Sequence, residues 1–118
     1  MLKYINEQLS NIINYELGLW TDKTIVFPFW VGEYQEINYS YENGCKEYSF
    51  TLTGTNRGTW SQLESDKNKI QELFANHTAI LPDGNSVAIF YETAYMIPSE
   101  DAEIRRMQIQ LNIKEWRN

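Results

Sequence analysis

The sequence is poor in the residues that most often perform chemistry. It has one cysteine, Cys45, and one histidine, His77, among 118 residues. A single cysteine excludes an intrachain disulfide, a CxxC redox pair and a thiolate zinc site. His77 falls at the predicted end of a helix, a position that polar or cationic side chains commonly occupy. We therefore expect a protein that is not an enzyme and has no catalytic residue, no metal ligand and no cofactor.

Positive charge is also scarce. Ten lysine and arginine residues face sixteen aspartate and glutamate residues, and the net charge is −6 at neutral pH. The only adjacent basic pair is Arg105–Arg106. Because nucleic-acid binding needs a basic patch that displaces counterions from phosphates, we expect no specific DNA binding.

Long apolar runs are absent as well. No stretch approaches the roughly 20 apolar residues that a membrane span requires. The first 17 residues alternate apolar with polar positions and lack the apolar segment and cleavage site of a secretory signal. The sequence therefore predicts a cytosolic protein with no membrane association.

The sequence does contain enough apolar side chains for one well-filled core. The apolar fraction is 42% and the aromatic fraction 14%, which predicts a single domain over residues 1–118. Apolar residues three and four apart predict an amphipathic helix over residues 2–17, with Gly18 as its C-terminal cap. The apolar run over residues 25–31 contains Pro28 and predicts a strand at a sheet edge.

A hairpin and a second helix are predicted in the middle of the chain. Asn43-Gly44 is a strong hairpin signal between two strands, because both residues tolerate positive φ. After a loop, Thr59 and Gln62 form a capping box for an amphipathic helix that ends near Asn76.

Two more strands are predicted near the C-terminus, over residues 86–97 and 106–114. The first is apolar and aromatic on both faces, which predicts a central position, and the second alternates as a half-solvated antiparallel strand. The predicted element order is therefore α-β-β-β-α-β-β. The predicted fold class is α+β, with one mostly antiparallel sheet of four to five strands and two helices packed on one face.

Aromatic residues exceed what one small sheet can bury. Four tryptophans and eight tyrosines are present. A stacking platform for single-stranded nucleic acid would also need a basic groove, which this acidic chain does not offer. The excess therefore predicts an oligomer interface, and it comprises Trp20, Trp30, Tyr34, Tyr39 and Tyr41.

Two segments of the chain resemble small phage tail proteins. Residues 48–74, YSFTLTGTNRGTWSQLESDKNKIQELF, resemble the strand–loop–helix centre of those proteins. Residues 88–116, AIFYETAYMIPSEDAEIRRMQIQLNIKEW, resemble their C-terminal strand pair. The element order is similar to that of the tail-terminator, or tail-completion, proteins of long-tailed phages and prophages, and neck and minor tail proteins share much of the pattern.

The resemblance implies a structural virion protein. Tail terminators form a ring, usually of six subunits, at the head-proximal end of the tail tube, where they stop tube polymerisation and join the tail to the head connector. The implied partners are further copies of the chain, the tail tube protein and the connector protein, in the host cytoplasm during assembly and then in the virion tail. DNA would pass through a negatively lined channel without specific binding.

Within this picture the exposed loops are the expected contact elements: residues 42–46, 55–58, 82–85 and 99–106. Arginine is favoured at interfaces, so salt bridges across subunits are expected there. The predicted interface residues are Glu42, Lys46, Asn56, Arg57, Asp83, Asn85, Glu100, Asp101, Arg105 and Arg106.

Two alternatives remain open at this point. One is a neck or minor tail protein of the same group. The other is a small-molecule-binding regulatory α+β domain that uses the aromatic face of its sheet as a pocket.

Overall fold

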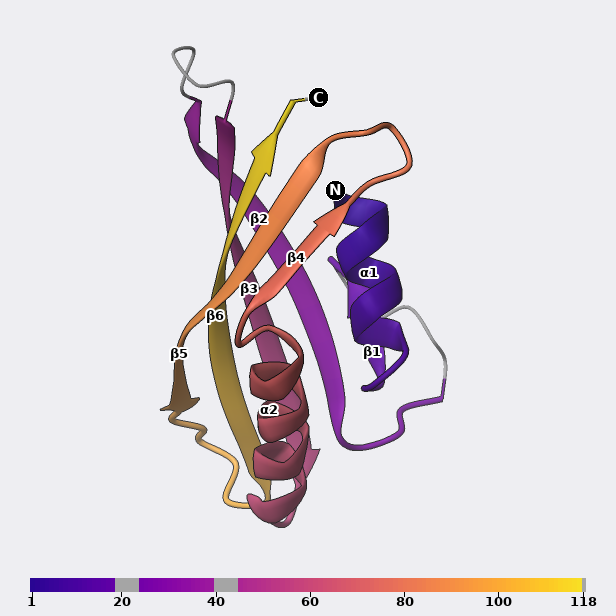
Figure 1. Ribbon diagram of the computed structural model, residues 1–118. Coiled ribbons are helices and arrows are strands. Elements are labelled where there is room, and N and C mark those ends of the chain that lie inside the picture. The colour runs from indigo at the N-terminus through magenta and orange to yellow at the C-terminus, as the bar shows by residue number, and fades with distance from the viewer. Residues whose placement is uncertain (19–23, 40–44, 118) are drawn as a thin grey trace.

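The computed structural model describes residues 1–18, 24–39 and 45–117, which form two helices and six strands. The elements follow the order α1-β1-β2-β3-α2-β4-β5-β6 (Figure 1). The helices are α1 (Leu2–Ser10) and α2 (Ser61–Leu73). The strands are β1 (Tyr15–Leu17), β2 (Phe29–Tyr39), β3 (Cys45–Arg57), β4 (His77–Ile80), β5 (Ser86–Ile97) and β6 (Ile104–Trp116).

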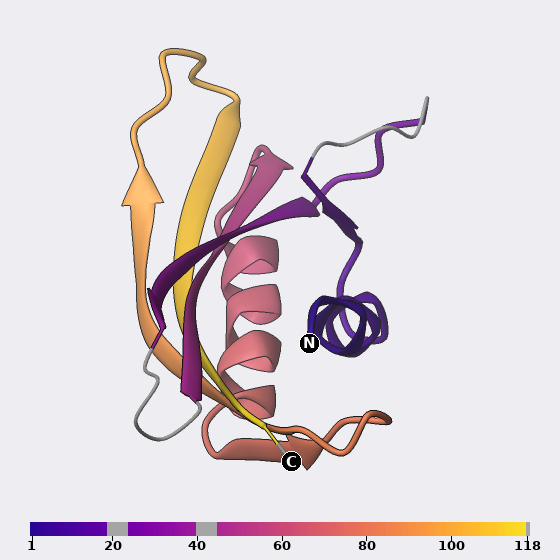
Figure 2. The same cartoon turned by 90° about the horizontal axis from the view of Figure 1, so that it is seen from above.

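The six strands form one curled sheet in the order β1-β2-β3-β6-β5-β4. β1 runs parallel to β2, and every other neighbouring pair is antiparallel. β3 and β6 pair without interruption from Cys45↔Trp116 to Arg57↔Ile104. Both helices lie on the concave side of the sheet, as Figure 2 shows in a view from above.

The core fills the space between the concave face and the helices. Alternate residues of β3 and β6 are buried, as expected for strands with one face in the core. α1 contributes Ile5 and Leu9, and α2 contributes Leu63 and Ile70. The largest fully buried side chains of the sheet are Trp30, Phe50, Leu52, Ile89, Ile109, Leu111 and Ile113.

Trp30 ties the sheet to α2. Its partner across the β2–β3 ladder is Gly54, and a Cβ at that glycine would lie 2.7 Å from the indole ring. The missing side chain therefore makes the room in which the indole lies. The indole Nε1 donates a hydrogen bond of 3.0 Å to Asp66 of α2, which satisfies the only polar group of a fully buried side chain.

The fold-class prediction was wrong. The sheet has six strands among the described residues rather than four to five, the parallel pairing of β1 with β2 makes it mixed, and two unpredicted strands change the element order. The two unpredicted strands, β1 and β4, are three and four residues long. Their strand state comes from pairing with β2 and β5, and so short a segment carries no periodicity of its own.

The N-terminal helix is shorter than predicted. α1 ends at Ser10 with Asn11 as its C-cap, whereas Tyr15–Leu17 are extended. Apolar residues continue at helical spacing beyond the end of α1, through Ile13, which is buried. This spacing led to the prediction of a longer helix. Pairing of β1 with residues 30–32 of β2 decides the conformation instead.

Three further element predictions need correction. β2 begins at Phe29, after a cis peptide bond between Phe27 and Pro28, and not at residue 25. α2 has no side-chain cap hydrogen bond, so the predicted capping box is not formed, and the helix ends at Leu73. β5 is not central along its whole length, because β4 covers only Ser86–Ile89. The predicted hairpin turn, Asn43-Gly44, lies outside the described residues.

We predict that Gly54→Ala destabilises the protein. Alanine is ordinarily better than glycine inside a strand by about 0.5–1 kcal/mol. Here the new methyl group would lie 2.7 Å from the Trp30 ring, so we expect a loss of about 1–3 kcal/mol in the free energy of unfolding. Urea denaturation followed by circular dichroism measures this change.

Thr53→Ala is the matched control, because Thr53 neighbours Gly54 on β3 but faces away from the core. Its stability should stay within about 0.5 kcal/mol of the parent. An equal or higher stability for Gly54→Ala would mean that the indole does not depend on the space above the glycine.

Candidate assembly surface

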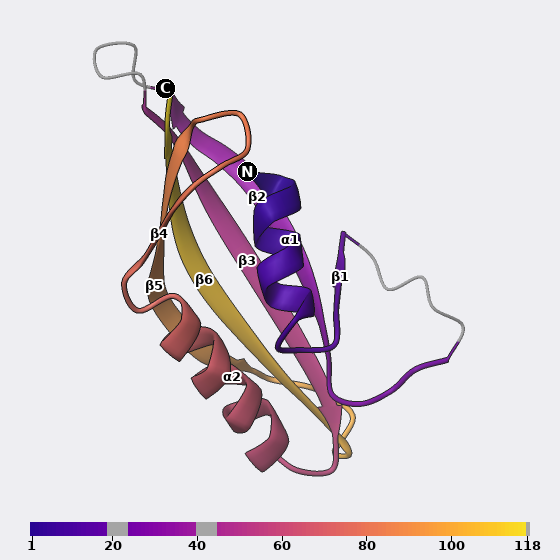
Figure 3. The ribbon, with the colours of Figure 1, turned by 45° about the vertical axis from the view of Figure 1, so that its right-hand side comes forward.

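The predicted interface residues separate into two groups at opposite ends of the molecule. The chain is elongated, with extents of 49 × 24 × 23 Å. The loop between β5 and β6 and the start of α2 lie at one end, and the β4–β5 turn and the ends of β2 and β6 lie at the other (Figure 3). Arg57, Glu100, Asp101, Arg105 and Arg106 belong to the first end, and Lys46, Asp83 and Asn85 to the second.

At the first end, Arg57 is already paired within the chain. Its Nη2 lies 2.7 Å from Oε2 of Glu103, and both side chains are well exposed. This hydrogen bond and the charge of Glu103 raise the pKa of the Arg57 guanidinium. The Glu103 backbone N–H donates to Oδ1 of Asp101, which orders the loop between β5 and β6. Arg57 and Asp101 therefore lie together, as parts of one loop surface.

Arg105 and Arg106 point to opposite faces of β6. The Arg105 guanidinium carbon lies 6.0 Å from the centre of the Trp60 ring, and its Nη1 donates to the backbone carbonyl of Ala102. Arg106 is exposed on the outer, convex face, and it has no ion-pair partner among the described residues. Of the two arginines, Arg106 is therefore the one whose guanidinium is exposed on the sheet without an ion-pair partner among the described residues.

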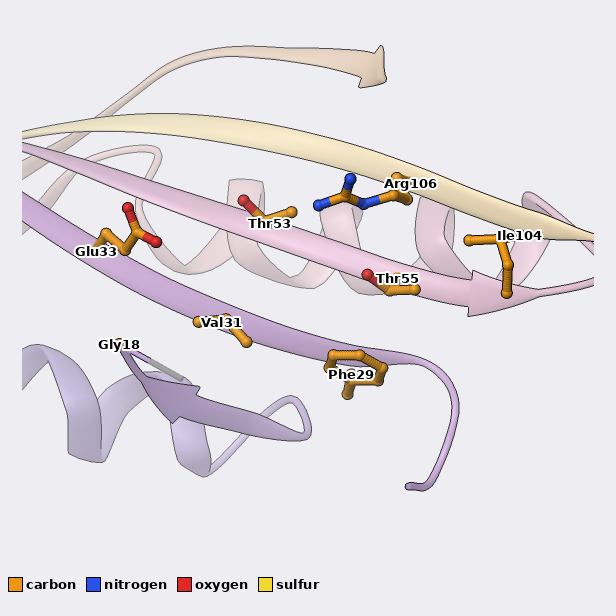
Figure 4. A pocket seen from close by; sticks show the side chains of 8 residues that line it. All are labelled: Gly18, Phe29, Val31, Glu33, Thr53, Thr55, Ile104 and Arg106. Atoms are coloured by element: carbon orange, nitrogen blue, oxygen red, sulfur yellow. The ribbon is translucent and has the colours of Figure 1, made fainter. Parts of the chain in front are cut away.

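Arg106 borders a shallow hollow of about 500 Å³ on the convex face. Figure 4 shows Glu33 of β2 and Arg106 of β6 on either side of Thr53, which belongs to β3. Phe29 and Val31 complete the β2 side of this hollow. The surface offers one acid, one base and hydroxyl groups over the sheet.

At the second end, the predicted residues serve local structure. Asp83 accepts a hydrogen bond of 2.9 Å from the backbone N–H of Asn85, which closes the β4–β5 turn. The Asn85 amide donates to Oε2 of Glu115 at 3.2 Å. Lys46 lies in β3, opposite Glu115 of β6, and is half-buried rather than in a loop. Glu42 lies outside the described residues.

Asn56 is not a surface residue. It lies in β3 and is 1% exposed, so the prediction of a loop over residues 55–58 was wrong for Thr55 to Arg57. Its Nδ2 donates to the carbonyl of Thr59 at 2.8 Å and to Oε1 of Gln62 at 3.0 Å. These bonds fix the turn from β3 into α2. A direct contact of Asn56 with a partner would require that turn to open.

Two segments of the sheet keep an unpaired edge. β1 covers residues 30–32 of β2 and leaves Glu33–Tyr39 open on that side, within the described residues. β4 covers Ser86–Ile89 of β5 and leaves residues 90–97 open on the opposite side. An open strand edge presents unpaired backbone N–H and C=O groups to a partner chain. We call these segments the β2 edge (33–39) and the β5 edge (90–97).

Large apolar side chains are exposed on both edges. Tyr34 and Ile37 are about half exposed on the β2 edge. On the β5 edge, Met96 is 61% exposed, and Phe90 and Tyr95 are also exposed. Sequence reasoning identified only Tyr34. Phe90, Tyr95 and Met96 were missed because their strand was interpreted as central, where apolar side chains on both faces need no partner.

Tyr34 is held in place by Tyr48. The two rings meet edge to face with their centres 6.1 Å apart. Burial, followed by the charges of Glu115 and Glu36, raises the pKa of Tyr48 to about 12, so its hydroxyl stays protonated and donates to Glu115. Of the other predicted interface aromatics, Trp30 is fully buried. Trp20, Tyr41 and the side chain of Tyr39 lie outside the part of the molecule that the structure describes.

The lone histidine and cysteine have structural contacts. His77 Nε2 shares a short hydrogen bond with the Tyr4 hydroxyl, and its Nδ1 lies 3.2 Å from the Leu73 carbonyl. Cys45 is buried at the start of β3. Across residues 1–18, 24–39 and 45–117, no group of three or more His, Cys, Asp or Glu side chains could hold a metal ion. In the same residues no helix has the length and apolar character needed to cross a membrane.

We predict that Asn56→Ala lowers stability by about 1–3 kcal/mol, because it removes two hydrogen bonds from a buried site and leaves the Thr59 carbonyl without its donor. Urea unfolding measures the loss. Arg106→Ala serves as the comparison, since an exposed and unpaired side chain should change stability by less than about 0.5 kcal/mol. Equal stability of the two variants would contradict the structural role assigned to Asn56.

Comparison with known proteins adds no family to this geometry. No protein-family model matches the chain, and no curated protein is significantly similar to it.

Proposed function

We propose that this protein is a structural subunit that assembles with copies of itself into a ring, and that the ring is the tail terminator of a long-tailed phage. It would stop polymerisation of the tail tube and connect the tail to the head. The two ends of the elongated subunit would face the tube protein on one side and the connector on the other. DNA would pass through the ring without specific binding.

The observation that carries this proposal is the pair of open edges on opposite sides of one sheet, each with exposed apolar side chains. Monomeric proteins usually protect long edges or keep them polar. Because the two edges differ from each other, a contact between them is head to tail rather than two-fold. Head-to-tail contacts generate rings when the rotation closes.

A binding pocket receives less support. The hollow on the convex face is lined by two threonines, two aliphatic side chains, Phe29 and Gly18, with Glu33 and Arg106 as its only charged groups among the lining residues. Ligand sites usually enclose most of the ligand and converge several polar groups on it. The regulatory-domain alternative predicts instead a melting temperature that rises with a small ligand, and a monomer at all concentrations.

We predict that the purified chain forms a discrete assembly, with a mass of about six times the 13.9 kDa of one chain. Light scattering after size-exclusion chromatography gives the mass, and negative-stain electron microscopy shows whether the particle is a closed ring. A monomer at every concentration tested would overturn the ring.

The biological role needs a separate measurement. Particles from a host in which the gene is deleted should carry overlong or irregular tails without heads. Tails of normal length beside unattached heads would move the protein to a neck role. Intact infectious particles would remove the phage function altogether.

A further inference from the structure

We propose that neighbouring subunits join by strand pairing between the β5 edge of one copy and the β2 edge of the next. The pairing is antiparallel, with Tyr34 of one copy opposite Met96 of the other. This inference rests on the proposed ring and names the surface that builds it. The outward backbone groups, the strand directions, a hollow beside the β5 edge and the charges of Glu36 and Lys67 support it.

The first argument concerns the backbone groups that face outwards. On β2, the Trp30 N–H and the Gly32 carbonyl point to the β1 side, where they bond to Asn14 and Gly18. Backbone groups alternate along a strand, so those of Tyr34 and Glu36 point to the same open side. On β5, the Asn85 carbonyl points towards β4, where it accepts from Leu81. A bulge at Glu92 shifts the alternation, and the outward groups further along belong to Ala94 and Met96.

The second argument concerns strand direction. β2, β3, β6 and β5 are consecutive antiparallel neighbours, so β2 and β5 run in opposite directions. Two copies placed side by side in the same orientation therefore meet as antiparallel strands. The residues with outward backbone groups on both edges also have side chains on the concave side, so the sheet continues from copy to copy with its concave face on one side.

The third argument fixes the register. The β5 edge borders a hollow of about 330 Å³ on the concave side, which contains Met96, Met107 and Trp60. Tyr34 opposite Met96 would enter this hollow and bury both of these exposed side chains. The contact joins an aromatic ring to a thioether, a pairing worth about 0.3–1.5 kcal/mol beyond the buried area. The same register places Glu36 opposite Ala94, and Gln35 opposite Tyr95.

Charge supports this register. Lys67 of α2 lines the same hollow together with Ala94, Trp60 and Met96. Neither Lys67 nor Glu36 has an ion-pair partner within the described residues of its own chain. With Glu36 of the next copy opposite Ala94, its carboxylate would lie beside the Lys67 ammonium. Glu64 also lines the hollow. In this register it would lie nearer to Tyr34 of the next copy than to Glu36.

The ends of each edge limit the contact. β1 blocks the remainder of β2, and β4 blocks the remainder of β5, at opposite ends of the strands. The open edges are therefore displaced along the strand direction, and joining them staggers each copy against the next. Closed sheets require such a stagger together with a tilt of the strands. The two bulges, at Ile37 and Glu92, confine the uninterrupted pairing to about four or five residues.

Disulfide cross-linking tests the register directly. In a Cys45→Ala background, Gln35→Cys combined with Tyr95→Cys places two thiols at a pair without mutual hydrogen bonds, where the Cα atoms approach within disulfide range. After mild oxidation we expect a ladder of covalent multimers that ends at the ring size on non-reducing gels. Gln35→Cys combined with Thr93→Cys is the control, shifted by two residues on the same face, and should cross-link at least tenfold less.

Single-cysteine variants separate the competing contacts. Gln35→Cys alone should give no covalent dimer, and neither should Tyr95→Cys alone. A strong dimer of either single variant would show a two-fold contact between like edges and would overturn the proposed pairing.

Charge exchange gives an independent readout. Glu36→Lys and Lys67→Glu should each raise the concentration needed for ring formation about tenfold or more, and the double variant should restore most of it. Ile80→Ser is the matched control, because Ile80 is 77% exposed on β4 but lies outside both edges. It should assemble like the parent.

The outcomes distinguish the two proposals. Rings that persist in both charge variants and show no Gln35–Tyr95 cross-link would overturn the pairing and leave the ring-forming function in place. A parent chain that stays monomeric would overturn both.

Discussion

The contact between Trp30 and Gly54 is the constraint on which the rest of the structure depends. A bulky indole can lie flat against β3 only because that strand has no side chain at this point. The indole then fills the concavity and reaches Asp66, which fixes α2 over the neighbouring strands. The curl of the sheet, the depth of the core and the position of α2 therefore all depend on one large residue opposite one absent side chain.

The two shortest strands decide which parts of the sheet edges stay open. β1 and β4 add little to the core, but each covers part of a long strand and leaves the remainder open. β1 covers the start of β2 and β4 covers the start of β5, and these two places lie at opposite ends and on opposite sides of the sheet. The molecule therefore has two different open edges that are offset along its length. A sheet covered fully on both sides would have no such surface, and one without β1 and β4 would have edges long enough to pair without a limit.

The sequence was sufficient for the elements with strong periodicity. The strand over residues 86–97 has the bounds of β5, and the alternation near the C-terminus marks most of β6. It was insufficient where distant residues decide local structure, as in β1 and β4, whose strand state depends on pairing. Asn56 shows the same limit at the candidate site. The sequence Thr-Asn-Arg-Gly is typical of an exposed loop, but the turn into α2 buries the asparagine. The open edge of β5 could not be predicted, since an apolar strand looks alike whether it is central or covered by another subunit.

The uninterrupted ladder between β3 and β6 has a mechanical consequence. It extends over thirteen residue pairs along the long axis of the molecule, without a bulge. Its hydrogen bonds lie across that axis, so a pull between the two ends of the molecule loads them in shear and shares the force among all of them. Tension applied between the two ends of the molecule would therefore be transmitted mainly through this pair of strands.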